Sequence, residues 1–473
     1  MRQTALRNAS LLAVLGCAAL VTSGTLATNA ASPQPSSSSV TCAQYNRGGT
    51  DFPPLPTSLD PTCAQPPLDM VGTPGQPSAD TYGWLTFIAM NWPVVKGRCI
   101  ADSTKNIATA PANPTWLSYL QPDAVFVPSG RPAGWCGTPT GANGSGRSAA
   151  LAQLPPRVRA LAAKHPEVTL FLHHSAKSHD LVTALNVEQR RHLTGGMRGA
   201  PLTDPGLKGI LDATDQPVTD QNGRFVRYTV AMNFDEYRYI IAKRLWTKSG
   251  QQAAGVLKLP QGARPGTSGP VGAMEFKAAW KILGKNDDPT HFFWQWAIVY
   301  NDDSGAPSPG VNPVKAGLVG LHITHKTAGQ PNWLWTTFEQ TDYKKGFNNP
   351  NCPAAQCPPN VQTAPTPYIE LNPNGTPRNK PVQVVAATPP TAGQLNPKFQ
   401  AMLGNSPWSH YEEISTQWSG NLGGPKPHSL GNPILETFVK QTVPYNCLGC
   451  HNFAHDKPAG NKSDFSFQIH AQQ

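Results

Sequence analysis

Residues 316–325 read AGLVGLHITH, and this run decides what kind of fold the chain can have. It is short, apolar and bounded by polar residues, which predicts a buried strand. Strands of the same kind are expected at 225–232, 273–283, 292–300 and 333–338. Because short strands separated by polar turns favour antiparallel pairing, we expect a mainly antiparallel sheet rather than a doubly wound parallel one.

Helical patterns flank these strands. From Trp84 onward apolar side chains follow a helical spacing, and Pro93 ends the pattern. After Asn233 or Asp235, apolar residues recur on one face as far as Leu245. Further helices are expected at 155–164 and at 180–192, the second beginning at Asp180. Helices together with an antiparallel sheet predict the α+β class.

Composition divides the chain of 473 residues into four parts: 1–31, 32–80, 81–440 and 441–473. The first is typical of an export signal, with two arginines, an apolar run and small residues before a cut after Ala30 or Ala31. The second is rich in Pro and Ser and predicts an extended segment. The third is the large α+β body, which is loop-rich because the chain has 49 prolines and 42 glycines.

The N-terminus allows a second interpretation. Residues 14–17, VLGC, resemble the cleavage site of a lipoprotein signal, although the chain stays apolar after Cys17. Both interpretations predict an exported protein, periplasmic or extracellular. No other apolar run in the sequence is long enough for a transmembrane helix, so the membrane would be a partner only through a lipid on Cys17.

The chain is basic, with a formal net charge of +10. The excess is spread along the sequence, without the dense Lys/Arg run of a nucleic-acid-binding protein, and we expect no nucleic-acid partner. A dispersed basic surface is either ordinary solvated surface or a docking surface for an acidic redox protein.

The most specific motif is Cys447-Leu-Gly-Cys450-His451. Cys-x-x-Cys-His is the attachment signature of c-type haem, in which two thiols add to the vinyl groups and the histidine binds the iron. By composition alone, about 0.005 copies are expected in such a chain. A thiol-redox pair would need a thioredoxin-like context and zinc a second ligand pair, and the sequence has neither. We therefore predict one covalent haem c.

Nine cysteines are present. Cys17 leaves with the signal or carries the lipid, and Cys447 and Cys450 hold the haem, so six remain for an oxidising compartment. Their proximity in the sequence suggests the pairs Cys42–Cys63, Cys99–Cys136 and Cys352–Cys357.

The motif lies late in the chain, and no methionine follows it. The histidines beyond it, His455 and His470, are weak candidates for a distal ligand, so the body must supply the other side of the haem. The candidates there are His322 and His325, which point to opposite faces of one strand, and Met402. The cluster that contains His173, His174 and His179 is a lesser candidate, and an open distal site is the remaining option.

Five stretches resemble a large group of exported bacterial proteins known as cytochrome c-like and otherwise uncharacterised. They are WLTFIAMNWP (84–93), GAMEFKAAWKIL (272–283), GLVGLHITHKT (317–327), PNWLWTTFEQTD (331–342) and the tail CLGCH…SDFSFQIHA (447–471). The resemblance implies covalent haem on Cys447, Cys450 and His451, and implies no substrate. We expect the closing DFSF to anchor the tail through Phe465 and Phe467, by burial of alternate residues.

Three classes of function follow. The first is an electron-transfer protein that works with a redox partner protein. The second is a haem-dependent oxidoreductase, related in chemistry to peroxidases, oxygenases or dehydrogenases, with an open distal iron site and an unidentified small substrate. The third is a sensor or a haem-bearing subunit of a larger assembly. We expect the first, because the chain has no flavin, nucleotide or metalloprotease motif.

Overall fold

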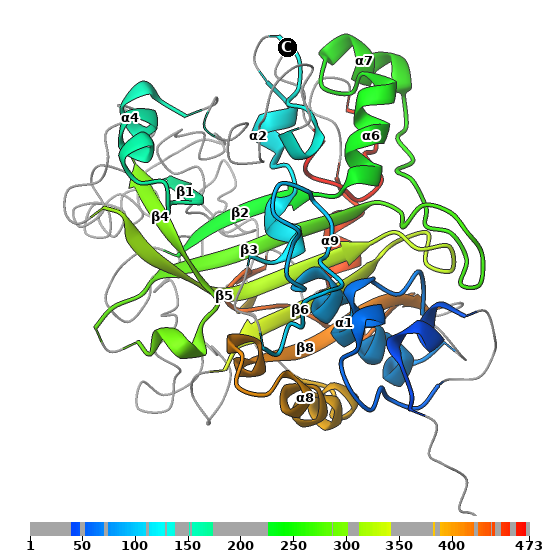
Figure 1. The fold of residues 1–473 in the computed structure, drawn as a ribbon. Helices are drawn as coiled ribbons and strands as arrows, with labels where there is room; N and C mark the ends of the chain where they lie inside the picture. The colour runs from blue at the N-terminus through cyan, green and yellow to red at the C-terminus, as the bar shows by residue number, and fades with distance from the viewer. Residues whose placement is uncertain are drawn as a thin grey trace, which may run out of the picture. The chain divides into compact units, whose positions relative to one another are not determined.

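The computed structural model describes residues 39–47, 53–70, 74–109, 113–127, 130–137, 151, 154–173, 226–285, 287–300, 312–341, 382–383, 388–420, 424–436, 438–439, 446–454 and 460–469. From Val40 onward they belong to one compact unit. The structure is α+β, as expected, and its sheet is mostly antiparallel (Figure 1).

The described residues form an eight-stranded sheet and a separate two-stranded one. The larger contains β1 (Leu170–His173), β2 (Arg227–Met232), β3 (Met274–Ile282), β4 (Trp294–Tyr300), β5 (Val314–His325), β6 (Leu334–Gln340), β8 (Tyr411–Gly420) and β9 (Gly424–Lys426). The smaller pairs β7 (Val382–Gln383) with β10 (Phe438–Val439). Only β1 and β4 pair in parallel among these strands.

Strand β5 has three partners. Along one edge it pairs with β3 over almost its whole length, from Ala316 to His325. Along the other edge, its first residues pair with β4 and its last residues, from Gly320 onward, pair with β6. The run that dominates the sequence is therefore the central strand of the sheet, flanked by paired strands on both sides.

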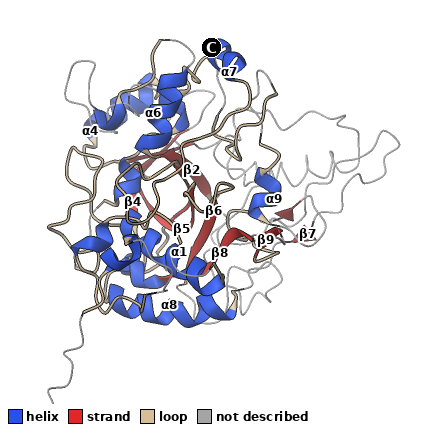
Figure 2. Cartoon of the chain, turned by 90° about the vertical axis from the view of Figure 1, so that its right-hand side faces the viewer, coloured by secondary structure: helices blue, strands red, loops and turns tan. Residues whose placement is uncertain are grey.

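The helices are α1 (Gln76–Met90), α2 (Pro122–Val125), α4 (Pro156–Lys164), α6 (Phe234–Lys243), α7 (Lys248–Ala254), α8 (Pro390–Leu403) and α9 (Cys447–His451). Helix α6 begins at Asn233, whose side chain accepts a hydrogen bond from the Glu236 amide. Helices α1 and α8 contact each other and both contact β8, and Figure 2 shows them together beside the strands.

The register gives the sheet two faces. Cross-strand neighbours share a face, so Phe276 lies with Ile323, and Lys277 lies with His322 and Thr337. We call the first the α1 face, because its residues share a hydrophobic core with α1 and α8. We call the second the α9 face, because α9 packs there through Leu448 against Trp335.

Aromatic rings fill the α1 face. Trp84 of α1 lies edge-on to Phe338 at 4.9 Å and stacks on Phe399 of α8 at 5.2 Å, both between ring centroids. Its indole nitrogen donates to the Asn396 side chain at 2.8 Å. Each such ring pair contributes about 0.5–1.5 kcal/mol beyond its buried area, which fixes α1 and α8 against the sheet.

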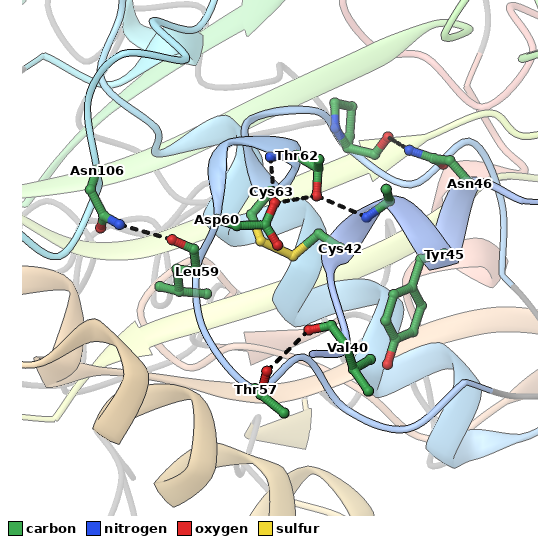
Figure 3. Close-up of a disulfide and its surroundings, with 12 residues drawn as sticks. Val40, Cys42, Tyr45, Asn46, Thr57, Leu59, Asp60, Thr62, Cys63 and Asn106 are labelled. Atoms are coloured by element: carbon green, nitrogen blue, oxygen red, sulfur yellow. Dashed lines mark hydrogen bonds between the residues drawn. A yellow bond between two sulfur atoms is a disulfide. The ribbon is translucent and has the colours of Figure 1, made fainter. Parts of the chain in front are cut away.

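The segment before α1 is folded back on this core. Short 3₁₀ helices at Cys42–Asn46 and Pro61–Ala64 are joined by the expected Cys42–Cys63 disulfide (Figure 3). The Asp60 side chain caps the second one by accepting from the Thr62 amide at 2.7 Å. The expected Cys99–Cys136 disulfide is also present, whereas Cys352 and Cys357 lie outside the described residues.

Candidate functional site

The Cys-x-x-Cys-His motif forms the short helix α9. Asn446 caps it, accepting from the Gly449 amide at 2.5 Å, and thereby orders the backbone at its first turn. The Leu448 side chain is buried, and its amide donates to the Gln417 side chain of β8 at 2.9 Å. The sequence motif is therefore held against the α9 face by both packing and a backbone hydrogen bond.

The two thiols have different surroundings. Cys447 is half-buried, packs against Ile414 and Leu430, and its pKa is raised by burial and by the nearby Glu436. Cys450 is exposed. No disulfide joins the two.

His451 is held in one tautomer. Its Nδ1 is 2.8 Å from the Phe465 carbonyl oxygen, which can only accept, so Nδ1 carries the proton and donates. Burial lowers the pKa of His451 to about 4, so the ring is neutral and Nε2 keeps its lone pair. Metal-binding histidines usually donate a hydrogen bond from the ring nitrogen that does not bind the metal, which fixes the tautomer.

Aromatic side chains surround the His451 ring. Trp335 lies 4.5 Å and Phe467 4.9 Å from it, between ring centroids. Phe467 is 51 % exposed and Phe453, next to the motif, is 66 % exposed. A large flat apolar group attached to the two thiols would cover such rings, so the residues present fit a porphyrin.

The tail is anchored by polar groups more than by its aromatic residues. Asp464 accepts from the Leu259 amide at 2.6 Å and pairs with the buried Lys326. The Trp333 indole donates to the Asp464 carbonyl at 3.0 Å. Phe465 is half-buried in the core, but the expectation for Phe467 is wrong, because that ring stays exposed beside His451.

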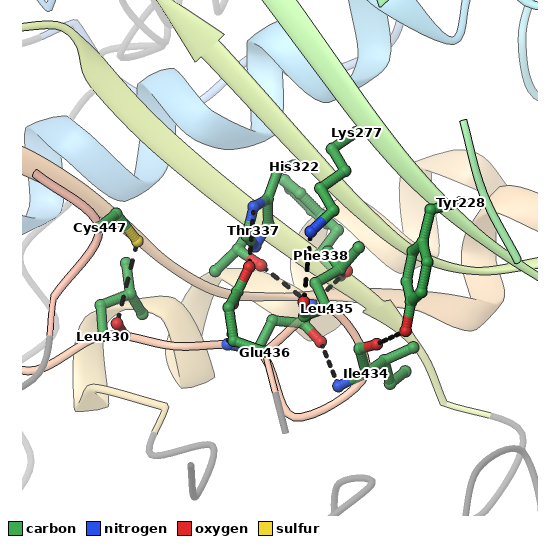
Figure 4. Close-up of polar contacts among 11 residues, drawn as sticks. Tyr228, Lys277, His322, Thr337, Phe338, Leu430, Ile434, Leu435, Glu436 and Cys447 are labelled. Carbon is green, nitrogen blue, oxygen red and sulfur yellow. Dashed lines mark hydrogen bonds and ion pairs between the residues drawn. The ribbon is translucent and has the colours of Figure 1, made fainter. Parts of the chain in front are cut away.

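His322 lies on the α9 face. Its Nδ1 is 3.5 Å from a carboxyl oxygen of Glu436, while its Nε2 is buried and has no hydrogen-bond partner among the described residues (Figure 4). Burial and the neighbouring Lys277 lower the pKa of His322 to about 3, so the ring is neutral. Burial raises the pKa of Glu436 to about 7.

His325 lies on the opposite, α1 face, as the strand alternation predicts. Its Nδ1 meets the Tyr82 hydroxyl and its Nε2 is 2.7 Å from the Val271 carbonyl oxygen. Met402 belongs to α8 and packs against the core on this same face. The structure therefore does not bring His325 or Met402 together with α9.

The remaining candidates are not placed. His174, His179, His455 and His470 lie outside the described residues, and of His173 only the backbone, in β1, is described. Within the described ranges, three or more His, Cys, Asp or Glu side chains nowhere gather as a metal cluster.

Sequence reasoning missed Glu436, Glu275 and Glu236, all on or near the α9 face. Burial raises the pKa of Glu236 well above 4.5 and that of Glu275 to about 7, and each lies close to Asp464 of the tail. Glu275 lies in β3, which reads MEFKAAWKI and also contains Lys277 and Lys281, so the pattern does not single it out. Glu436 gives no signal either, because it lies in an irregular segment.

Comparison with models of protein families, with curated proteins and with solved structures finds no match to this chain. Among the helices that the structure describes, none has the length and apolar character needed to cross a bilayer.

Proposed function

We propose that the chain is a c-type cytochrome, which carries one haem covalently on Cys447 and Cys450 and transfers electrons. The observation that carries the proposal is the state of His451 within the motif: Nδ1 is fixed as a donor to a backbone carbonyl, so Nε2 is free to bind iron. The alternative tautomer would leave no lone pair on that side of the ring.

Each neighbour has a defined task in this proposal. The bound haem iron would supply one-electron redox chemistry between its ferrous and ferric states. Trp335 and Phe467 pack against the His451 ring and limit its rotation. The Asp464–Lys326 pair holds the tail, which places the Phe465 carbonyl against Nδ1.

The cellular context belongs to the same proposal. The N-terminal signal and the two disulfides fit export to an oxidising compartment, periplasmic or extracellular. The donor or acceptor of electrons would be another redox protein, and the dispersed positive charge suits an acidic one.

Covalent attachment is tested with the full chain, exported in a host that assembles c-type cytochromes. The pyridine haemochrome of the purified protein should show one c-type haem per chain, and Cys447→Ala/Cys450→Ala should abolish it, because both thioether bonds are lost. The matched control, Cys99→Ala/Cys136→Ala, removes two disulfide-bonded cysteines outside the motif and should keep the haem. A wild-type protein without covalent haem, or a Cys447/Cys450 variant that retains it, would overturn the proposal.

A further inference from the structure

We infer that His322 Nε2 is the second axial ligand of this haem and that Glu436 positions the His322 ring; the inference rests on the proposed function. The structure offers one candidate on each face of β5, and only His322 shares a face with α9. The assignment makes the iron six-coordinate, which suits a carrier and leaves no open position for a substrate.

The first step is the unsatisfied nitrogen. Nε2 of His322 is buried and makes no hydrogen bond within the described part of the chain. A buried polar atom without a partner costs about 1–3 kcal/mol, so its position needs an explanation, such as a bound ion or ligand. Coordination to a metal would remove this penalty, because a neutral imidazole nitrogen is a strong ligand.

The second step is the contact on the other side of the ring. The Nδ1 of His322 faces a Glu436 carboxyl oxygen at 3.5 Å. A carboxyl group that accepts from Nδ1–H leaves the lone pair on Nε2, and this histidine–carboxylate arrangement is common behind metal ligands. Glu436 is itself fixed, since its other carboxyl oxygen accepts from the Asn432 amide at 3.1 Å.

The third step is proximity to the motif. Trp335 lies 4.5 Å from the His451 ring between centroids, and it is two positions along β6 from Thr337, which pairs with His322 in the sheet. Figure 4 shows Cys447, Glu436 and His322 together, with Glu436 extended toward His322. The proposed ligand and its carboxyl partner therefore belong to the surroundings of α9.

The fourth step excludes the alternatives that the structure describes. Both ring nitrogens of His325 are occupied, by Tyr82 and by the Val271 carbonyl, and the ring faces α1. Met402 packs on that same α1 side of the sheet. Neither side chain could reach the α9 face without crossing the sheet.

The wild-type protein gives the first test, with no variant that could fail to fold. We expect a low-spin ferric spectrum, a near-infrared charge-transfer band typical of two imidazole ligands, and no binding of carbon monoxide to the ferrous form. High-spin iron that binds carbon monoxide, or a band typical of methionine ligation, would overturn the inference but leave the proposed function intact. The absence of covalent haem would instead overturn the proposed function.

The variants identify the residue. His322→Ala should keep its covalent haem, become high-spin, bind carbon monoxide, and return to low spin when imidazole is added. The matched control, His325→Ala, removes a buried histidine from the same strand and should stay low-spin. A low-spin His322→Ala protein without added imidazole contradicts the assignment.

Glu436 has its own readout. Glu436→Gln should stay low-spin but have a higher reduction potential, because a carboxylate behind a ligand makes it more basic and stabilises ferric iron. Glu412→Gln, at a half-buried carboxyl group on β8 whose pKa burial also raises to about 7, is the control and should leave the potential unchanged. Equal shifts of the reduction potential in both variants would contradict a positioning role for Glu436.

Discussion

At the scale of single residues, the α1 face contains a buried acidic pair. Asp80 of α1 and Glu413 of β8 are both fully buried. Asp80 accepts hydrogen bonds from the Ser415 hydroxyl and the Thr416 amide, each at 3.0 Å. Burial raises the pKa of both carboxyl groups, and Asp80 raises that of Glu413 further. The pair thus binds protons more tightly in the folded chain than in the unfolded chain.

This difference predicts a pH dependence of stability. The stabilising contribution of Glu413 is complete below its ordinary pKa of 4.5 and is lost as pH rises toward its higher folded value. Glu413→Gln keeps an acceptor for the Thr416 hydroxyl and cannot ionise. We expect the variant to match the wild type near pH 4.5 and to exceed it at pH 8, by about 1.4 kcal/mol per unit of raised pKa. Urea unfolding at the two pH values measures the free energy of unfolding of both proteins. The same difference between variant and wild type at both pH values would contradict the prediction.

Residues differ in how well the sequence predicts them. Cys447, Cys450 and His451 can be identified from spacing alone, because the chemistry of haem attachment fixes that spacing. Strand alternation shows that His322 and His325 take opposite faces, but not which face meets α9, since that depends on packing. Glu436 cannot be identified, because its partner His322 is more than 100 positions away in the sequence.

At the scale of elements, an ion pair contributes to holding the tail on the sheet. Lys326 follows β5 and is buried, and its ammonium pairs with Asp464. Asp464→Asn keeps a group that accepts from the Leu259 amide but leaves Lys326 without its counter-charge. Breaking such a buried pair typically costs about 3–5 kcal/mol. We expect a loss of free energy of unfolding of that order, measured by urea titration.

The control is an ion pair on α6 whose cation is solvent-exposed. Arg238 lies 3.5 Å from Asp235, one helical turn apart, and its side chain is largely solvent-exposed. Arg238→Gln should cost less than about 1 kcal/mol. If the two substitutions destabilise the chain equally, the tail is not anchored as described.

The expected strands at 225–232, 273–283, 292–300, 316–325 and 333–338 are confirmed as β2 to β6. They could be predicted because they are short runs rich in apolar, aromatic and β-branched residues, bounded by polar turn clusters. The expected helices at 155–164 and after Asn233 are confirmed, and the one at 180–192 lies outside the described residues.

Three elements contradict or extend the predictions. Helix α8 is not among the expected helices, because Pro390 and Pro397 obscure its pattern; Pro390 is tolerated at the first helical position. Strand β8 reads YEEISTQWSG and is not predicted, because its many polar residues do not suggest a buried strand. They are buried because α1 and α8 supply hydrogen-bond partners for this strand. Helix α1 begins at Gln76, within a stretch predicted to be extended.

At the scale of the whole molecule, the two faces of the sheet carry different parts of the structure. The α1 face holds the larger aromatic core, together with Cys42 and Cys63 of the N-terminal segment. The α9 face holds the motif and the tail. Disturbing the N-terminal segment should therefore change stability without changing the proposed haem site.

The Cys42–Cys63 disulfide gives a direct test of this separation. The bond closes a loop with a sequence separation of 21 residues. Cys42→Ala/Cys63→Ala should lower the free energy of unfolding by about 2–4 kcal/mol, since an uncrosslinked unfolded chain has more conformational freedom. Thermal unfolding measures the loss, while the haem absorbance spectrum at low temperature should stay that of the wild type. A changed spectrum would show that the two faces are coupled.

The pairing of β5 with three strands also decides which histidine side chain faces the proposed haem. A strand that slips by one residue turns every side chain to the other face, so a slip of β5 would turn His322 toward α1 and His325 toward α9. A wrong register would thus still offer a histidine on the α9 face, without Glu436 matched to it. The β-bulge at Val319 of β5, between the residues that pair with Ala279 and Trp280 of β3, and the simultaneous pairing of β5 with β3, β4 and β6 allow one alignment. The backbone pairing of β5 therefore determines which histidine can bind the iron. A misaligned β5 would be seen as a change in iron ligation.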